Sequence, residues 1–243
     1  MKSILITLIS MAACAAAEDP KPAPAQPPKQ VVVDMQIITL PAQAAIPLIA
    51  EMRDPKKSDA AFAQIQQLLA KKEAILIAWP MLAMQSGEQS VAEDINEVRY
   101  PSDFEAPSVR IEPDYSSPTK TEKKRAPVTL SLTEFTPTPT SFEVRNTGVT
   151  LQVEPRYNAE RDSLTLQYAA QRVALTGYDK ATIEIKPAGT KIAVEVPKFR
   201  ANKVTSSSTI ASGKSILIGV FRAIETEGHM ELFILRATAA PEN

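Results

Sequence analysis

The sequence predicts an α+β fold that is predominantly antiparallel β, with a short βαα start followed by an array of β-hairpins. Two observations lead to this prediction. Apolar side chains recur at helical spacing only in the region of residues 42–72, and in most segments after residue 74 they recur every second residue. Glycine-containing turns at Gly87, 212–213 and 227–228 then separate the strand segments and are expected to be hairpin turns.

The start of the folded region contains one predicted strand and two predicted helices. Residues 31–38 are rich in β-branched side chains, which favours a strand. After Pro41 the apolar residues take helical spacing, and Pro47 is expected to limit or kink that helix. Ser58 is the predicted N-cap of a second helix. The apolar face of this second helix comprises Ala61, Phe62, Ile65, Leu68 and Leu69.

Strand candidates follow one another from residue 74 onward. In residues 128–133 apolar and hydroxyl side chains alternate, which is typical of a sheet with one buried and one wet face. Residues 216–221 are apolar throughout and suit a central strand. The predicted strands cover residues 74–78, 81–85, 90–95, 128–135, 149–154, 164–169, 182–186, 191–196, 204–211, 216–221 and 230–237.

Residues 1–17 have the pattern of a secretory signal peptide, because a positive start is followed by a short apolar run and then by small residues. The apolar run is shorter than the ~20 residues that cross a bilayer. Two processing sites fit the sequence. Residues 15–17 allow cleavage before Glu18, whereas residues 11–14 are similar to a lipobox that would make Cys14 a lipidated N-terminus. In either case we expect the mature chain to be exported.

The remaining sequence divides into four parts. Residues 18–30 contain five prolines and almost no apolar side chain, so they are expected to form an extended linker. The β-rich domain is expected at residues 31–239, with a tail at residues 240–243. Within the domain, residues 100–139 are rich in proline and are expected to form a long loop.

Composition excludes several classes of function. The chain has 243 residues and a net charge of −1, so nothing in its balance attracts nucleic acid. One Cys and one His cannot supply the four ligands of a structural zinc site. His229 lies between two predicted strands and is interpreted as a turn residue. Residues 206–208 are serines in a predicted strand, without the Gly-x-Ser-x-Gly turn of a hydrolase. No catalytic residue, metal ligand or cofactor is predicted.

Three stretches, read in order, resemble the C-terminal domain of bacterial type II and type III secretion secretins. The first covers residues 75–91 with 97–101, the second covers residues 142–155, and the third extends from residue 197 to residue 238. Each contains turn or strand motifs of the family, such as the Ser-Gly-Glu turn at residues 86–88. The positions that carry the resemblance are Pro80, Gly87, Tyr100, Pro101, Gly148, Pro155, Phe199, Val204, Gly213, Gly219 and Glu231.

The resemblance implies a non-catalytic component of a protein secretion system, either a pore subunit of a homo-oligomeric ring or an accessory relative, in the outer membrane or periplasm of a Gram-negative-type bacterium. It also implies partners among other envelope proteins of a secretion system. By position, residues 100–139 correspond to the hairpin that gates the pore, and residues 173–196 to the part of the wall that meets the membrane. A ring subunit must leave both sheet edges free for its neighbours.

The alternative function is a monomeric periplasmic lipoprotein or binding module that keeps the secretin fold without forming a pore. The sequence suits either function because it resembles a secretin in reduced form. Only the linker and the βαα start precede the hairpin array, whereas secretins usually carry several ring-forming periplasmic modules there.

Overall fold

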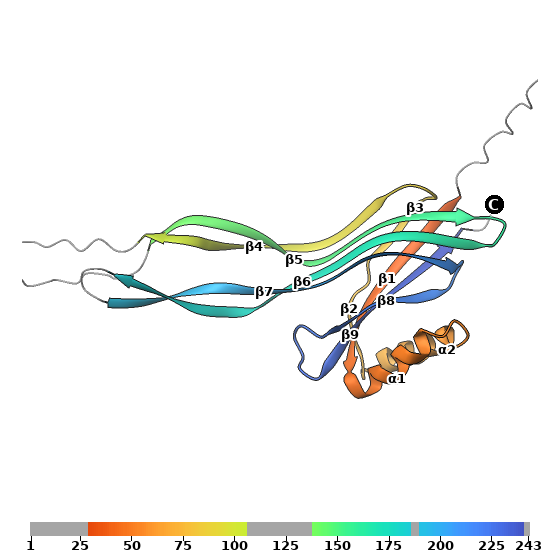
Figure 1. Cartoon of the computed structure of the whole chain (residues 1–243), viewed down its shortest axis with the longest axis horizontal. Coiled ribbons are helices and arrows are strands. Elements are labelled where there is room, and N and C mark those ends of the chain that lie inside the picture. The colour runs from red at the N-terminus through yellow and green to blue at the C-terminus, as the bar shows by residue number, and fades with distance from the viewer. Residues whose placement is uncertain (1–28, 106–137, 186–189, 241–243) are drawn as a thin grey trace, which may run out of the picture.

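The computed structural model describes residues 29–105, 138–185 and 190–240, which contain nine strands and two helices (Figure 1). Most of this part of the chain is antiparallel β-structure, so the predicted α+β class is confirmed. The elements in chain order are β1 (Gln30–Pro41), α1 (Ala42–Met52), α2 (Ser58–Ala70), β2 (Ile75–Ala78), β3 (Met81–Gln85), β4 (Ser90–Glu105), β5 (Thr138–Asn158), β6 (Ser163–Ile185), β7 (Thr190–Ala211), β8 (Ser215–Arg222) and β9 (His229–Ala239).

The strands form two antiparallel sheets. The first, which we call the short sheet, has the order β2-β1-β9-β8, and β3 pairs with β1 beyond the end of β2. The second, which we call the long sheet, has the order β4-β5-β6-β7. The long sheet is contributed by one continuous run of the chain, and it is inserted between the strands of the short sheet in sequence.

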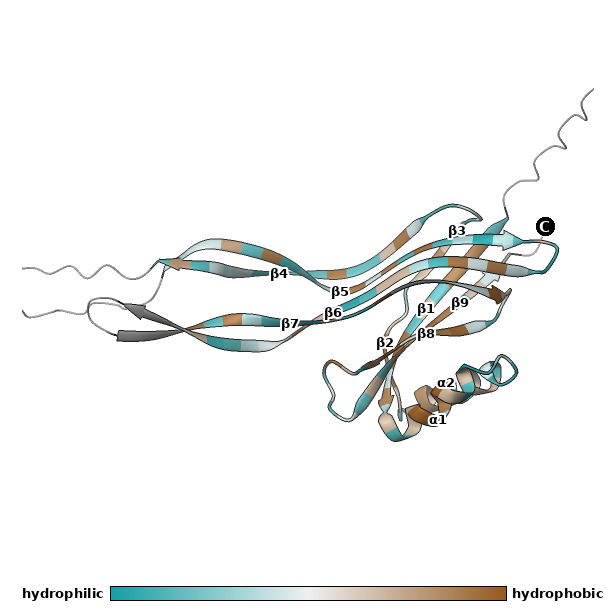
Figure 2. Cartoon of the chain, in the orientation of Figure 1, coloured by the Kyte–Doolittle hydropathy of each residue, from teal (hydrophilic) through white to brown (hydrophobic). Residues whose placement is uncertain are grey.

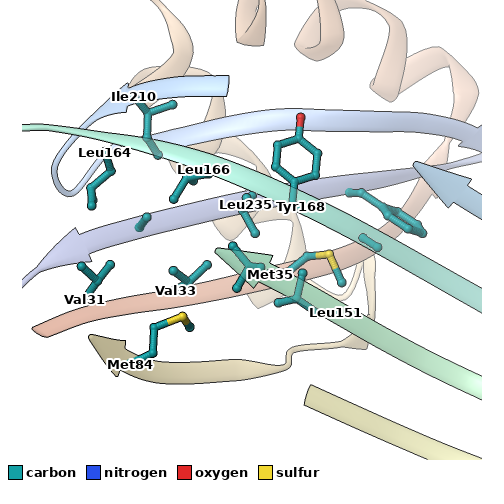
Figure 3. Packing of buried hydrophobic residues seen from close by; sticks show 14 of the residues in the cluster. Val31, Val33, Met35, Met84, Leu151, Leu164, Leu166, Tyr168, Ile210 and Leu235 are labelled. Carbon is teal, nitrogen blue, oxygen red and sulfur yellow. The ribbon is translucent and has the colours of Figure 1, made fainter. Parts of the chain in front are cut away.

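The main hydrophobic core lies between the two sheets (Figure 3). Met35 and Leu235 of the short sheet pack in the same cluster as Leu151 and Leu166 of the long sheet, and all four side chains are fully buried. Alternate residues of each strand point into this layer, as the pleat of a β-strand requires. Each such side chain stabilises the fold by roughly 1.5–3 kcal/mol through its burial.

A second core lies on the opposite face of the short sheet, which α1 and α2 cover (Figure 1). Ile38 of β1 and Ile234 of β9 pack there with Leu48 of α1 and Ile65 of α2. The short sheet is therefore covered on both faces. This explains why β1 reads as a nearly continuous apolar strand.

Two details of the helical start differ from the sequence-based expectation. Ser58 is the first residue of α2 and is buried, whereas Lys57 occupies the N-cap and provides no side-chain cap. The Ser58 hydroxyl instead donates to the carbonyl of Pro55 at 3.4 Å. Helix α1 runs through Pro47 to Met52, so Pro47 does not end it. A proline removes only one N–H donor, and the residues around it remain packed in the core.

Four strands are longer than their apolar pattern predicts. The strand expected at 90–95 continues to Glu105 in β4, and the strand expected at 149–154 extends over Thr138–Asn158 in β5. Two pairs of predicted strands each merge, one pair into β6 and the other into β7. Figure 2 shows mixed polar and apolar bands along these extensions. The residues added at 96–105 and 138–148 have mostly exposed side chains on both faces, so no two-residue period of apolar side chains reveals these parts as strand.

The predicted loop at 100–139 is therefore wrong at both ends. Residues 100–105 belong to β4 and residues 138–139 begin β5. The rest of that loop, with the predicted strand at 128–135, lies outside the described residues, as do residues 1–28 and Cys14 with them. Within the described residues, no helix is both long enough and apolar enough to cross a membrane.

Candidate assembly edges and the junction between the sheets

The long sheet ends in two long strands, the 16-residue β4 and the 22-residue β7. Among the described residues neither strand has a pairing partner on its outer side. The same holds for the short sheet, where β8 forms one edge and β2 with β3 forms the other. Unpaired edge strands as long as β4 and β7 present rows of free N–H and C=O groups to any strand that approaches.

Both sheets are four strands wide, and neighbouring strands alternate in direction. An even number of antiparallel strands leaves the two edges pointing in opposite directions. A second copy in the same orientation would therefore place its β7 antiparallel to β4 of the first copy. Head-to-tail addition continues the existing pattern of hydrogen bonds in both sheets.

The long sheet divides into two ribbons at Gly148. Pairing between β5 and β6 ends where Gly148 lies opposite Val173, whereas β4–β5 pairing continues to Glu105 and β6–β7 pairing continues to Ile185. We call the two extensions the β4–β5 ribbon and the β6–β7 ribbon. They extend side by side beyond the short sheet (Figure 1).

Gly148 is required at this division. Its φ is +117°, and a Cβ atom there would lie 2.1 Å from the carbonyl oxygen of Asp94 on β4. A side chain at this position would push β4 and β5 apart. The glycine therefore permits the close approach of the two strands at the point where the ribbons diverge.

The two ribbons contact one another through Tyr100 and Phe199, which both belong to the motif positions. Their ring centroids are 5.6 Å apart, and the guanidinium of Arg145 lies 4.9 Å from the centre of the Phe199 ring. The Tyr100 hydroxyl donates to Glu143 at 2.9 Å. This hydrogen bond, together with burial and the charge of Glu143, raises the pKa of Tyr100 above its ordinary value, and Arg145 opposes the shift.

Gly87 and Pro155 are also brought together. The amide of Gly87, whose φ is +89°, donates to the carbonyl of Pro155 at 2.6 Å, and the amide of Tyr157 donates to the hydroxyl of Ser86 at 2.9 Å. This turn carries the chain from β3 of the short sheet to β4 of the long sheet. The sequence predicts a hairpin at Gly87, but the two flanking strands belong to different sheets.

Gly213 occupies the return crossing from β7 to β8. Its amide donates to the carbonyl of Ala237 at 2.8 Å with a φ of +79°, and the hydroxyl of Ser212 accepts from the amide of Ala239 at 3.0 Å. The expected hairpin is wrong here as well, because β7 and β8 also lie in different sheets. A glycine with positive φ lets the chain reverse locally, but it does not decide which sheet the next strand joins. Of the three turns expected to form hairpins, only the one at 227–228 joins strands that pair, β8 and β9.

A buried polar cluster, which we call the polar junction, joins the two sheets close to the division at Gly148. Arg172 of β6 donates to Glu231 of β9 at 2.7 Å and to Glu225 at 2.6 Å. Asn202 of β7 donates to the other oxygen of Glu231 at 3.0 Å. Glu231 is completely buried and Arg172 is 6% exposed, so this pair is shielded from water. A buried carboxylate is tolerated only when it is paired and hydrogen-bonded in this way.

Of the polar junction, sequence reasoning had identified only Glu231. Arg172, Asn202 and Glu225 were missed. One signal for Arg172 was present in β6, because Leu164, Leu166 and every second residue after them point inward. Extending that alternation places Arg172 on the inner face, where a charge needs a partner.

The other motif positions have structural roles. The carbonyl of Pro80, between β2 and β3, accepts from the amide of Met35 at 3.0 Å. Pro101 lies opposite Phe142 in the β4–β5 ladder, and Val204 packs against the main core. A Cβ on Gly219 would lie 2.6 Å from the Phe221 ring.

No three potential metal ligands lie close together among residues 29–105, 138–185 and 190–240. His229, expected in a turn, is the first residue of β9, and its Nδ1 lies 3.1 Å from the carbonyl oxygen of Glu227. Ser208 of the serine run shares a hydrogen bond with the Tyr168 hydroxyl.

No family model matches the sequence, and no curated protein does. Among solved structures, the chain is similar to secretins. The secretin domain of InvG from the Salmonella SPI-1 injectisome matches with 10% identity and a TM-score of 0.44, over 89% of this chain and 64% of that one. ExeD of Aeromonas hydrophila matches with 11% identity and a TM-score of 0.43, over 88% of this chain and 49% of that one.

The type II secretin GspD of enteropathogenic Escherichia coli is also similar, with 11% identity and a TM-score of 0.40, over 89% of this chain and 71% of that one. The chain thus spans between about half and about two thirds of the length of the InvG and ExeD chains that it matches.

Proposed function

We propose that the chain is a wall subunit of a secretin-like, homo-oligomeric complex that serves protein export across the bacterial envelope. The observation that supports this proposal is the pair of open sheets. Each is four strands wide, each is antiparallel, and each has a free edge on both sides within the described residues. Copies added head to tail about one axis would complete both sheets at once and leave no edge unpaired.

The length of the edges favours self-assembly over a monomeric module. Proteins that remain monomeric protect their sheet edges with short strands, covering loops or bulges. Here β4 and β7 extend well beyond the core, and the chain that surrounds them in the described residues covers neither outer side. Free edges of 16 and 22 residues are an aggregation hazard unless a specific partner occupies them.

The motif residues support the secretin assignment because they lie at the points that shape the subunit. Gly87 and Gly213 occupy the two crossings between sheets, and Gly148 lies where the ribbons divide. Tyr100 and Phe199 hold the ribbons together. In the proposed complex the β4–β5 ribbon, which leads into residues 106–137, corresponds to the gating hairpin, and the β6–β7 ribbon corresponds to the part of the wall that meets the membrane.

Assembly is tested by size and by hydrogen exchange. We expect gel filtration with light scattering in mild detergent, without boiling, to give a multimer many times larger than the 26.4 kDa chain. The outward-facing amides of β4 and β7 should exchange slowly in the multimer and rapidly after dissociation, because only the multimer hydrogen-bonds them. If the protein remains monomeric at high concentration, the proposed ring is wrong, and the function as a monomeric binding module is favoured instead.

We further propose that the chain is exported and acts in the envelope with other proteins of a secretion system. The signal-like residues 1–17 and the candidate lipid acceptor Cys14 motivate this step. Cells fed a fatty-acid probe should label the protein, and Cys14→Ala should abolish the label. Unchanged labelling of the variant would mean that Cys14 is not the acceptor, and absence of label from both proteins would favour cleavage before Glu18.

A further inference from the structure

We propose that the two edges of the long sheet recognise one another by charge, with Lys203 on β7 of one copy set against Glu93 and Glu97 on β4 of the next. This inference rests on the proposed self-assembly. It adds on which face of the sheet, and through which side chains, the two edges recognise one another.

The two edges carry opposite charges on the same face of the sheet. The register places Glu93 opposite Thr150, Thr150 opposite Gln171, and Gln171 opposite Lys203. Glu93 and Lys203 are therefore the two ends of a single row across the sheet. Because side chains of paired residues point to the same face, both lie on the polar face away from the core.

Within one chain the two residues cannot pair. They are separated by three strand spacings, which amounts to about 14 Å. Both side chains are exposed, and among the described residues neither forms an ion pair. Each is thus a free charge at an open edge, and head-to-tail addition would bring the unlike charges together.

The neighbouring rows are compatible with this contact. Val91 begins the row that ends in Thr205, and Ile95 begins the row that ends in Ala201. Val91 is 51% exposed and Ile95 is 36% exposed, so a strand placed against β4 would cover apolar surface on either side of Glu93. The residues that β7 would present to them are small and carry no charge, so no unpaired charge would be covered.

The proposal allows for the stagger between copies that closing a ring requires. A stagger must be an even number of residues, because an odd shift would turn every side chain to the other face. With no stagger Lys203 lies opposite Glu93, and with a shift of four residues it lies opposite Glu97, which is exposed on the same face of β4. Asp94 is excluded from the contact because it points to the other face, in the row of Val149 and Arg172.

Charge reversal in trans tests this contact. Glu93→Lys combined with Glu97→Lys makes both edges basic, and Lys203→Glu makes both edges acidic. Each variant alone should need about fivefold more protein than the wild type for half-assembly at low salt, as expected for the loss of one exposed pair. An equimolar mixture should assemble as the wild type does, because every β4 edge then finds a β7 edge of opposite charge.

The controls separate this inference from the proposed function. Lys56→Glu changes the charge by the same amount as Lys203→Glu, but in the exposed loop between α1 and α2, and it should leave assembly unchanged. The defect of each variant should shrink in 1 M salt, where the Debye length is about 3 Å. Suppose that the wild type assembles, and that the reversed variants assemble equally well or their mixture does not regain wild-type assembly. The proposed charge contact is then wrong, and the proposed ring is unaffected. If the wild type itself stays monomeric, both the proposed ring and the proposed charge contact are wrong.

Discussion

Arg172 on β6 and Glu231 on β9 form an ion pair 2.7 Å long in the interior of the protein, between residues 59 positions apart in the sequence. The pair joins the long sheet to the short sheet beside the point where the ribbons divide. Ion pairs at a protein surface contribute little, whereas a buried charge that loses its partner is costly. This pair therefore fixes how the two layers of the subunit are held against one another.

Removing one partner of the pair should destabilise the fold strongly. Arg172→Met leaves the carboxylate of Glu231 buried with only Asn202 to hydrogen-bond it. We expect a loss of about 3–5 kcal/mol in the free energy of unfolding, measured by urea denaturation. Glu225→Gln is the matched control, because the side chain of Glu225 is 58% exposed, and its loss should stay below about 1 kcal/mol. Similar losses for the two variants would show that burial of the pair is not what matters.

The double variant Arg172→Met with Glu231→Leu refines this test. It removes both charges and fills the site with apolar side chains, so most of the stability lost in Arg172→Met should return. A double variant as unstable as the single one would instead point to the packing of the arginine stem as the main contribution.

Gly148→Ala should destabilise the long sheet at its division. The new Cβ would lie 2.1 Å from a carbonyl oxygen and would occupy a φ of +117°. Gly177→Ala provides the control, since Gly177 also has a positive φ, +143°, but open space around its Cβ position. We expect a loss of about 1–3 kcal/mol at Gly148 and a smaller loss at Gly177, both by thermal or urea unfolding. Equal losses would mean that backbone strain alone is responsible and that the close approach is relieved elsewhere.

Tyr100 should titrate above the ordinary tyrosine value of 10.0, because its hydroxyl donates to Glu143. A raised pKa in the folded state means that this contact stabilises the ribbon fully below the ordinary value and is lost as the pH rises through the raised one. NMR of the ¹³C-labelled tyrosine ring, assigned with Tyr100→Phe, measures the pKa directly. Glu143→Gln should lower it and Arg145→Gln should raise it further. A pKa that does not respond to Glu143→Gln would exclude the hydrogen bond as its cause.

The contact between the ribbons should have a measurable coupling energy. A double-mutant cycle of Tyr100→Leu and Phe199→Leu isolates the ring contact, whose centroids are 5.6 Å apart, and should give about 0.5–1.5 kcal/mol. Phe142, which contacts Arg99 within the β4–β5 ribbon, supplies the control. A cycle of Tyr100→Leu with Phe142→Leu should give no coupling. Zero coupling in both cycles would mean that the rings do not hold the ribbons together.

The types and order of the elements followed from the sequence by itself wherever one face of an element is buried. The strand predicted at 81–85 is β3 with the same bounds, and the strand predicted at 216–221 differs from β8 by one residue at each end. The apolar face of the second helix includes Ala61 and Ile65, which are buried against the short sheet. In these segments the side-chain period records burial, and burial is what local spacing can report.

Only the tertiary structure decided three other properties. It assigned the strands on either side of Gly87 and Gly213 to different sheets. It also extended the four strands β4, β5, β6 and β7 into two ribbons whose faces are both exposed. Finally, it brought Arg172 and Glu231 together as an ion pair. The physical reason is the same in each case. Strand pairing and the neutralisation of a buried charge depend on groups that are distant in sequence, and neither leaves a local period that the amino-acid order alone can show.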